Sequence, residues 1–326
     1  LAKSAGMGFN IDAEEADRLE LSLDVIAEVL SDPALKGWDG FGVVVQAYGP
    51  RASHVINWLY ELASLLNRRI MVRLVKGAYW DTEIKRAQTL GIDGFPVFTR
   101  KTSTDVSYIA CAKNLLGMTD RIYPQFATHN AHTVAAVLEL ATAGQPFEFQ
   151  RLHGMGEALH GVVLAEAGTR CRIYAPVGAH EDLLAYLVRR LLENGANSSF
   201  VNQIVDESLA PADIATDPFT AVQKPGGNQA NPNIRQPDSL YGPDRKNARG
   251  WDLTHQDDLA EIEAGRSAWQ SHQWSAKPQT VRAATGGEIV KIGNPADHGD
   301  IGGHVILGAA ATVPDALADA RSGVEK

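Results

Sequence analysis

The densest group of side chains that could do chemistry lies at residues 73–80, which read RLVKGAYW. If this segment begins as a strand, Arg73 and Val75 point to one face of it. Gly77 has no Cβ, so its backbone can approach a ligand closely. Charged residues inside a sheet commonly pair with one another, so Arg73 alone favours a structural role. Lys76, at the end of the strand, is also placed to act as an amine nucleophile, as in a Schiff-base aldolase.

A second polar group, Thr128-His129-Asn130, directly follows an apolar stretch. A single histidine at a strand end is as often a structural residue as a functional one. Three adjacent polar side chains are harder to explain by packing, and they suit hydrogen bonding to a polar cofactor. The group therefore predicts a binding site at the end of a strand.

The third group lies on a predicted helix at residues 182–192. Apolar residues three and four positions apart form one face, which leaves Tyr186, Arg189, Arg190 and Glu193 together on the opposite face. For an isolated helix, the usual interpretation is a solvated face with an internal ion pair. The functional alternative is a pair of guanidinium groups that bind a substrate carboxylate in a fork geometry that lysine cannot reproduce.

These groups need a scaffold, and the apolar pattern predicts an α/β fold with six βα units. The predicted strands are 7–11, 42–46, 70–75, 122–127, 147–152 and 171–174, and each precedes a helical pattern such as 14–30, 52–66 or 182–192. Polar residues lie at or just past most strand ends: Asp12, Gln46, Lys76, His129 and His153. A (β/α)8 barrel builds its active site at these ends, so the placement suits catalysis. An open doubly wound sheet would use the same ends, but no GxGxxG follows any predicted strand.

Six units do not close an eight-stranded barrel. The first residues, LAKSAG, contain neither an initiator methionine nor the basic and apolar segments of a targeting signal. We therefore expect a distorted TIM-type barrel whose first two strands lie in sequence upstream of residue 1.

The composition is that of a globular protein, with 44% hydrophobic and 21% charged residues among 326. No apolar run approaches the roughly 20 residues that span a bilayer. The net charge of −9 argues against nucleic acid as a partner of these residues, because phosphate binding requires concentrated Lys and Arg. Cys111 and Cys171 lack metal-ligand spacing, so we expect buried structural thiols in a reducing cytoplasm and no metal site.

The character of the chain changes near residue 205. Residues 206–250 are rich in Pro, Gly, Asn and Asp and are predicted to form an extended linker. A helix is predicted at 257–274, followed by strands at 286–292 and 301–305 and a helix from Val313. These elements predict a separate piece of structure over residues 251–326.

The proline dehydrogenase domain of the bifunctional proline utilization A enzymes resembles this chain in the motifs GFNIDAEEADRLELSLDV, RLVKGAYWDTEIKRAQ, YPQFATHNAHT, LHGMGE and CRIYAPVGAHEDLLAYLVRRLLENGANSSFVN, and in Gln46. The resemblance assigns residues 1–205 to the last six βα units of that barrel. The motifs NP, LYG and NPAD resemble the family's linker, at 206–250, and the start of its aldehyde-dehydrogenase-like domain, at 251–326.

The resemblance implies FAD-dependent oxidation of L-proline to 1-pyrroline-5-carboxylate, with hydride transfer to flavin N5 and electrons passed on to a quinone. It places the positive charge of Arg73 near N5, with Asp12 and Tyr79 as the other catalytic residues. The residues implied to hold the flavin are Gln46, Val75, Lys76, Gly77, Ala78, Trp80, Thr99, Arg100, Lys101, Thr128, His129 and Asn130. Of these, the segment 99–101 would reach its adenylate and phosphate parts.

The same resemblance implies a substrate site. Arg189 and Arg190 would bind the proline carboxylate, and Glu193 would orient one of these arginines. Leu152, Tyr174 and Tyr186 would form the wall around the apolar ring. On this hypothesis, Arg190→Met raises the KM for proline while the flavin is retained.

The resemblance also leaves several points open. A quinone acceptor implies peripheral association of a cytoplasmic enzyme with the inner membrane, and a homodimer is compatible with it. The NAD-dependent oxidation of glutamate semialdehyde is expected of the full-length family member and not of this chain, because no cysteine follows Cys171. The alternatives are the Lys76 aldolase and a catalytically inactive fragment of the bifunctional enzyme.

Overall fold

A computed structural model describes residues 1–184, 186, 188, 208, 210–224, 226–227, 229–282 and 286–324. The chain divides into two compact units, Leu1–His255 and Gln256–Lys326, and each is described by itself. In the described residues, no helix has the length and apolar character needed to cross a membrane.

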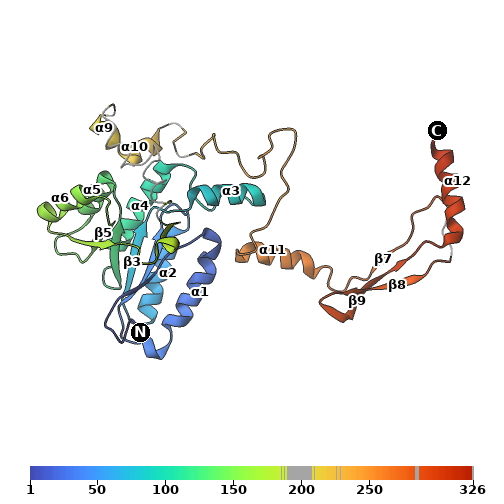
Figure 1. The fold of residues 1–326 in the computed structure, drawn as a ribbon, viewed down its shortest axis with the longest axis horizontal. Coiled ribbons are helices and arrows are strands. Elements are labelled where there is room, and N and C mark those ends of the chain that lie inside the picture. Colours follow the sequence, from blue (N-terminus) through green and yellow to red (C-terminus); the bar gives the residue numbers. More distant parts are fainter. Residues whose placement is uncertain are drawn as a thin grey trace. The chain divides into compact units, whose positions relative to one another are not determined.

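The first unit is built on one parallel sheet of six strands in the order β1-β2-β3-β4-β5-β6. Figure 1 draws this sheet with β3 and β5 labelled. The strands are β1 (Phe9–Ile11), β2 (Phe41–Gln46), β3 (Ile70–Val75), β4 (Ile122–Ala127), β5 (Glu148–Leu152) and β6 (Arg170–Tyr174). The helices are η1 (Ala16–Arg18), α1 (Leu19–Leu30), η2 (Pro33–Leu35), α2 (Ala52–Leu65), α3 (Trp80–Leu90), α4 (Lys101–Leu116), α5 (Ala131–Leu140), α6 (Glu157–Ala167), α9 (Pro211–Ile214) and α10 (Pro218–Gln223). The α/β class and the six parallel strands are thus confirmed, and the sheet is a curled half-barrel.

The register of the sheet sets which side chains can meet. Arg73 of β3 pairs with Val44 of β2 on one side and with Gln125 of β4 on the other. On β5, Leu152 pairs with Tyr174 of β6. Since all neighbouring strands run parallel, their carboxyl ends lie along the same edge of the sheet, where the predicted site residues are concentrated.

The hydrophobic core lies between the sheet and the helices that cover it. Alternate residues of β3, such as Val72 and Leu74, are fully buried, and Tyr108 of α4 is buried beside them. The Tyr108 hydroxyl donates to the carbonyl of Leu74 at 3.3 Å. The intervening residues of β3, which include Arg73, point to the opposite face. That face is the polar interior of the half-barrel.

Several predicted boundaries differ from those in the structure. The strand expected at 7–11 begins only at Phe9, and the helix expected from 14 begins as the short η1 before α1. Cys111 is buried as expected, whereas Cys171 is only half-buried because β6 is an edge strand of the described sheet.

Residues 229–250 contact α3 and the segment that follows it. The side-chain amide of Asn247 donates to the carbonyl of Gln88 at 2.9 Å, and the backbone N–H of Gly250 donates to Gly91 at 3.1 Å. A Cβ on Gly91 would lie 2.0 Å from the carbonyl oxygen of Ala248, so glycine is needed for this close approach. The second half of the predicted linker is therefore a packed part of the first unit.

The second unit contains α11 (Gln256–Ser267), β7 (Trp274–Ala276), β8 (Ile289–Asn294), β9 (Asp297–Ile306), η3 (Ala310–Thr312) and α12 (Val313–Val324). Its sheet has the order β7-β9-β8, with β8 and β9 antiparallel. The helix predicted at 257–274 ends at Ser267, and Trp274 instead begins β7. The ring of Trp274 stacks on that of Trp269, with 5.1 Å between the ring centroids.

Candidate active site

Arg73 is the centre of the candidate site. Its Nη1 lies 2.7 Å from Oδ1 of Asp12, which follows β1, and its Nε donates to Oε1 of Gln150 on β5 at 2.7 Å. Its guanidinium carbon lies 5.1 Å from the ring centroid of Tyr174, the last residue of β6. The half-barrel thus brings two of the three predicted catalytic residues together with one predicted wall of the substrate site.

The loop after β1 links the end of β2 and the segment after β3 to the surroundings of Arg73. Gln46 donates from Nε2 to the carbonyl of Glu14 at 2.8 Å and accepts from the N–H of Ala78 at 3.4 Å. The Tyr79 hydroxyl donates to the carboxylate of the same Glu14 at 2.8 Å. Glu14, which sequence reasoning missed, therefore links Gln46, Ala78 and Tyr79 beside Asp12.

Lys76 lies just past β3 in an ion pair with Asp105 of α4, which also binds Lys101 at 2.9 Å. Burial lowers the pKa of Lys76, and the charge of Asp105 opposes that shift. Burial raises the pKa of Asp105, but the charges of Lys76 and Lys101 outweigh it and leave this pKa below its usual range. Lys76 is therefore held as one member of a compact charged cluster.

Gly77 follows Lys76 with a φ of 140°, a conformation that favours glycine. A Cβ at this position would lie 2.3 Å from the ring of Tyr48. The absence of a side chain at Gly77 thus makes room for a ring of the same chain. Val75, which ends β3, is half-buried.

The Thr128-His129-Asn130 group lies after β4, as predicted. Nε2 of His129 accepts from the N–H of Leu152 at 3.2 Å, and Asn130 caps α5 by accepting from the N–H of Thr133 at 2.9 Å. The carbonyl of Thr128 accepts from the buried His160 at 3.0 Å. These contacts fix the loop between β4 and α5 and link it to the end of β5.

Three residues predicted to contact the flavin also form hydrogen bonds to other parts of the chain. The indole N–H of Trp80 donates to the carbonyl of Phe98 at 2.8 Å. Thr99 accepts from the N–H of Asn231 at 2.9 Å, and Arg100 donates to the carbonyl of Gln229 at 2.8 Å. In this structure, therefore, Thr99 and Arg100 contact the 229–250 segment.

The predicted carboxylate clamp falls outside the described residues, because Arg189, Arg190 and Glu193 are not among them. Tyr186 is described and half-buried. Leu152, at the end of β5, is buried and lies beside Tyr174 in the register of the sheet.

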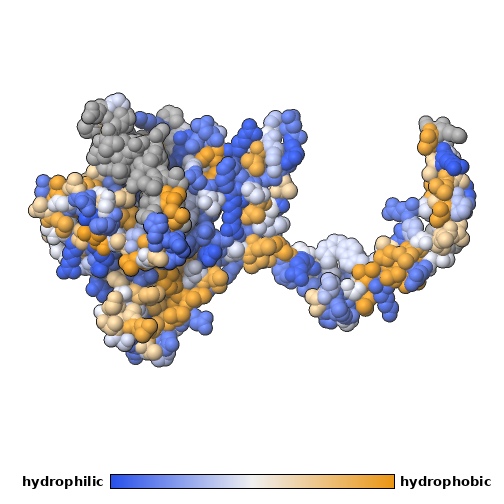
Figure 2. Space-filling view, viewed as in Figure 1, coloured by the Kyte–Doolittle hydropathy of each residue, from blue (hydrophilic) through white to orange (hydrophobic). Residues whose placement is uncertain are grey.

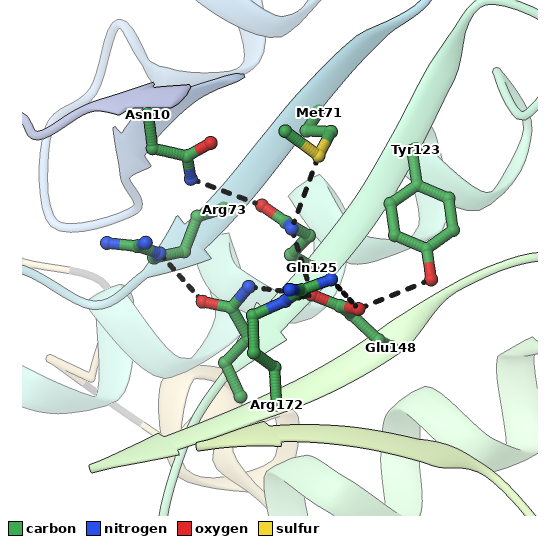
Figure 3. A network of polar contacts seen from close by, with 8 residues as sticks. Asn10, Met71, Arg73, Tyr123, Gln125, Glu148 and Arg172 are labelled. Carbon is green, nitrogen blue, oxygen red and sulfur yellow. Dashed lines mark hydrogen bonds and ion pairs between the residues drawn. The ribbon is translucent and has the colours of Figure 1, made fainter. Parts of the chain in front are cut away.

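A network of polar side chains inside the half-barrel was missed entirely by sequence reasoning (Figure 3). Its centre is the buried carboxylate of Glu148, at the start of β5, which binds both Nε and Nη2 of Arg172 at 2.6 and 2.9 Å. The side-chain amides of Gln125 and Gln150 donate to Oε1 of Glu148 at 2.9 and 2.8 Å. Asn10 donates to Gln125 at 3.4 Å, so the network extends from β1 to β6.

A signal for this network is present in the sequence. Glu148 and Gln150 lie two residues apart on one predicted strand, and Arg172 lies on the next, so alternation places polar groups on the same face. Only the register between the strands, which local patterns do not reveal, shows that these groups meet.

Comparison with known proteins agrees with this geometry. The sequence profile of the proline dehydrogenase family matches residues 1–203. The chain belongs to the proline dehydrogenase family. It is 50% identical to the bifunctional protein PutA of Klebsiella aerogenes, covering 98% of this chain and 25% of that protein. It is 29% identical to proline dehydrogenase 1 of Bacillus subtilis, covering 62% of this chain and 59% of that protein.

Solved structures of this family have the same fold. Proline utilization A from Bradyrhizobium japonicum superposes with a TM-score of 0.79 at 54% identity, over 86% of this chain and 28% of that one. The protein from Bdellovibrio bacteriovorus gives a TM-score of 0.84 at 30% identity, over 99% of this chain and 33% of that one. The chain thus spans about a quarter of the length of the PutA relatives that it matches.

Proposed function

We propose that the half-barrel binds FAD at the carboxyl ends of its strands and oxidises L-proline to 1-pyrroline-5-carboxylate. The observation that carries this proposal is the placement of Arg73 between Asp12, Gln150 and Tyr174 in a chain of the proline dehydrogenase family. The oxidation removes two electrons and two protons from proline as its C–N bond becomes C=N. FAD, when bound, supplies the acceptor for the hydride.

The residues at these strand ends suit such a cofactor. They offer an amide at Gln46, cations at Arg73 and Lys76, and the polar group 128–130, a donor set that matches a flavin and its diphosphate. Val75, Gly77, Ala78 and Trp80 lie on the same segment as Lys76. Lys101 begins α4 and shares Asp105 with Lys76, and these residues complete the proposed site. Thr99 and Arg100 belong to the proposed flavin site as well, and they would contact the flavin in addition to Asn231 and Gln229.

The roles of the residues around the reacting atoms follow from their charges. The guanidinium of Arg73 stabilises negative charge that the cofactor gains on reduction, because it is fixed before the reaction begins. Asp12 holds one end of that guanidinium, and Tyr79 supports the loop that carries Asp12. Leu152 and Tyr174 exclude water from the ring of the substrate.

The proposed carboxylate site uses residues outside the described part of the chain. Arg189 and Arg190 bind the carboxylate of proline in a bidentate arrangement, and Glu193 orients one of them. Tyr186, on the same predicted helix, lies against the ring.

The finer architecture is also a proposal. Two further strands upstream of β1 would close the barrel, and residues 251–326 would begin an aldehyde-dehydrogenase-like domain after the 206–250 segment. That domain would use NAD in the full-length family member, and this chain alone would not oxidise the semialdehyde. Turnover of the semialdehyde with NAD by the chain alone would contradict this proposal.

We further propose that the enzyme is cytoplasmic and forms a homodimer. It would associate peripherally with the inner membrane and pass its electrons there to a quinone. The support is the family membership together with a net charge of −9, which disfavours nucleic acid as a partner of these residues.

The aldolase hypothesis receives less support. A Schiff-base lysine must be a neutral amine that a carbonyl substrate can reach. Although burial lowers the pKa of Lys76, its Nζ is held by Asp105, which favours the charged form. The inactive-fragment hypothesis differs from the main proposal only in its outcome with flavin and proline.

The test is the absorbance of the purified protein after reconstitution with FAD. We expect flavin bands in the visible spectrum that L-proline bleaches under anaerobic conditions, with D-proline as the control ligand. Flavin binding without bleaching would support the inactive fragment. Absence of flavin binding, with borohydride trapping of a carbonyl substrate on Lys76, would support the aldolase.

A further inference from the structure

The contacts of Arg73 form an ordered chain of hydrogen bonds that leads into the half-barrel. A guanidinium can only donate, and an ionised carboxylate can only accept. Between them, Gln150 accepts from Nε of Arg73 with its oxygen and donates to Oε1 of Glu148 with its nitrogen. The two ends of the chain therefore fix the orientation of the Gln150 amide, because a flipped amide would face a donor with a donor.

The carboxylate at the far end of this chain is kept ionised by its surroundings. Burial raises the pKa of Glu148, but hydrogen bonds from Arg172, Gln150 and Gln125 outweigh it, so the pKa lies below its usual range. The bidentate contact with Arg172 also fixes the carboxylate in space. Glu148, shown with Arg172 in Figure 3, is thus a rigid acceptor for the Gln150 amide.

The two hydrogen-bond partners of Arg73 differ in their exposure. The side chain of Asp12 is 71% exposed, so its attraction to Arg73 is weakened by solvent and salt. Gln150 is fully buried, and its bond to Nε cannot be replaced by water without opening the interior. The direction in which the guanidinium points is therefore set mainly from the buried side.

We propose that Gln150 and Glu148 are positioning residues for the guanidinium of Arg73, with Glu148 orienting Gln150 and Gln150 orienting Arg73. The inference rests on the proposed flavin chemistry, since it assigns Arg73 to the cofactor. Neither residue touches substrate or cofactor in this scheme. Their effect reaches the reaction only through the position of one positive charge.

The first test is Gln150→Leu in the flavin-loaded protein, which removes the acceptor for Arg73 and keeps a similar volume. We expect flavin reduction by saturating proline to slow about tenfold, by analogy with residues that orient metal ligands, whose loss costs about 10- to 100-fold. The midpoint potential of the bound flavin should shift downward, because a misplaced charge stabilises the reduced form less. Bound flavin per protein and the dissociation constant for proline should stay within about twofold of the parent.

The second test uses an exchange of the two side chains. Glu148→Gln alone removes the fixed acceptor, so the Gln150 amide can flip, and both the reduction rate and the potential should fall. Adding Gln150→Glu restores a group that can only accept from Arg73, while the new amide at 148 can donate to it. We expect the double variant to reverse at least half of the fall in midpoint potential that Glu148→Gln causes relative to the parent. Loss of packing alone would not give this recovery.

The matched control is Tyr123→Phe. It removes a hydroxyl that donates weakly to Oε2 of Glu148 at 3.4 Å and is not part of the hydrogen-bond chain from Glu148 through Gln150 to Arg73. It should leave the rate and the potential unchanged. Parent-like potentials in Gln150→Leu and Glu148→Gln, with flavin retained, would overturn the proposal, and so would an exchange variant that folds but shows no recovery. If the parent itself is not bleached by proline, the proposed function fails instead. If Gln150→Leu does not fold, the exchange pair decides.

Discussion

The middle strands of the parallel sheet and its two edge strands differ sharply in burial. Each of β2, β3, β4 and β5 buries at least every second residue, whereas no residue of β1 or β6 is buried. The proposed flavin contacts Gln46, Lys76 and His129 follow or end middle strands. Asp12 and Tyr174, which contact Arg73, stand at the ends of the edge strands. The proposed flavin contacts are thus tied to the core, whereas these two partners of Arg73 are not.

The space-filling view shows apolar side chains at the surface of the first unit (Figure 2). Among the exposed apolar residues are Phe9 and Ile11 of β1 and Ile173 of β6. Among the described residues, β1 and β6 each pair with one neighbouring strand only and bury no residue, so they contribute little to the core that they flank. Substitutions at the edges should therefore change chemistry without unfolding the protein, and those at core positions of the middle strands should do the reverse. The exceptions in the middle strands are Arg73, the Gln150–Glu148 pair that orients it, and the proposed flavin contacts at the strand ends.

The largest expected effect is that of Arg73→Met, the first of these exceptions in the middle strands. Removing a preorganised charge should slow flavin reduction by proline about 100- to 1,000-fold. Arg69→Met is the control, because Arg69 precedes the same strand at its other end and donates to the carbonyl of Thr119 at 3.0 Å. Rapid-mixing absorbance measures both. Equal slowing in the two variants would mean that Arg73 acts through the fold and not through the cofactor.

The second effect contrasts two isoleucines of the same sheet. Ile70 begins β3 and is fully buried, whereas Ile173 of β6 is 52% exposed. Ile70→Ala should lower the free energy of unfolding by about 2–5 kcal/mol, because it leaves a cavity in the core. Ile173→Ala should change it by less than about 0.5 kcal/mol. Urea unfolding compares them, and similar losses would show that β6 is as well supported as β3.

This contrast also explains how far the sequence could be interpreted. The six strands and the polar residues at their ends were predictable, because alternation and β-branched residues are local signals. Arg73, Asp12 and Tyr174, which the family resemblance assigned to one site, lie together in the structure, and their roles stay predictions. The start of β1 was placed two residues too early, since Met7 and Gly8 continue its apolar pattern without pairing to β2.

Contacts between distant segments could not be predicted. Glu148 meets Gln125 and Arg172 only because three strands stand in one register, and no local pattern specifies that register. The 229–250 segment is held largely by bonds to backbone groups, as between Asn247 and the carbonyl of Gln88, and such bonds leave no trace in hydrophobic periodicity. With no such signal in the sequence, its content of Pro, Gly, Asn and Asp predicted an extended linker and not a packed segment.

The third effect probes the substrate side at the edge of the sheet. Tyr174→Leu removes the ring beside the Arg73 guanidinium, and kcat/KM for proline should fall about tenfold through loss of that contact and of the pocket wall. The melting temperature and flavin content should not change, because Tyr174 ends an exposed strand. Tyr241→Leu is the control, since its ring also contacts an arginine, Arg245, at 3.6 Å. A loss of flavin in Tyr174→Leu would place this edge in the cofactor site.

The smallest effect concerns pH and compares two buried glutamates. Hydrogen bonds hold the pKa of Glu148 below its usual range despite its burial, whereas burial and the charge of Asp17 raise the pKa of Glu83 on α3. Glu148 therefore contributes stability that is complete above the ordinary glutamate pKa of about 4.3 and is lost as the pH falls through the lower folded value. Glu83 has the opposite sign: the folded protein binds its proton more tightly than the unfolded chain, so stability falls as the pH rises from the ordinary pKa of about 4.3 up to the raised value.

The substitutions to glutamine separate these two cases. Glu148→Gln should destabilise the protein most at neutral pH, and its difference from the parent should shrink below about pH 4. Glu83→Gln keeps an oxygen that can accept from the N–H of Ala16, the 2.6 Å bond that holds the loop after β1, so it should gain stability relative to the parent at pH 7 and lose that gain near pH 4. Urea unfolding at pH 4, 5.5 and 7 measures both differences. Parallel pH profiles for the two variants would mean that the pKa values of Glu148, in the interior, and Glu83, beside the loop after β1, are shifted in the same direction. The contrast between the middle and the edge of the sheet would then not extend to these two charges.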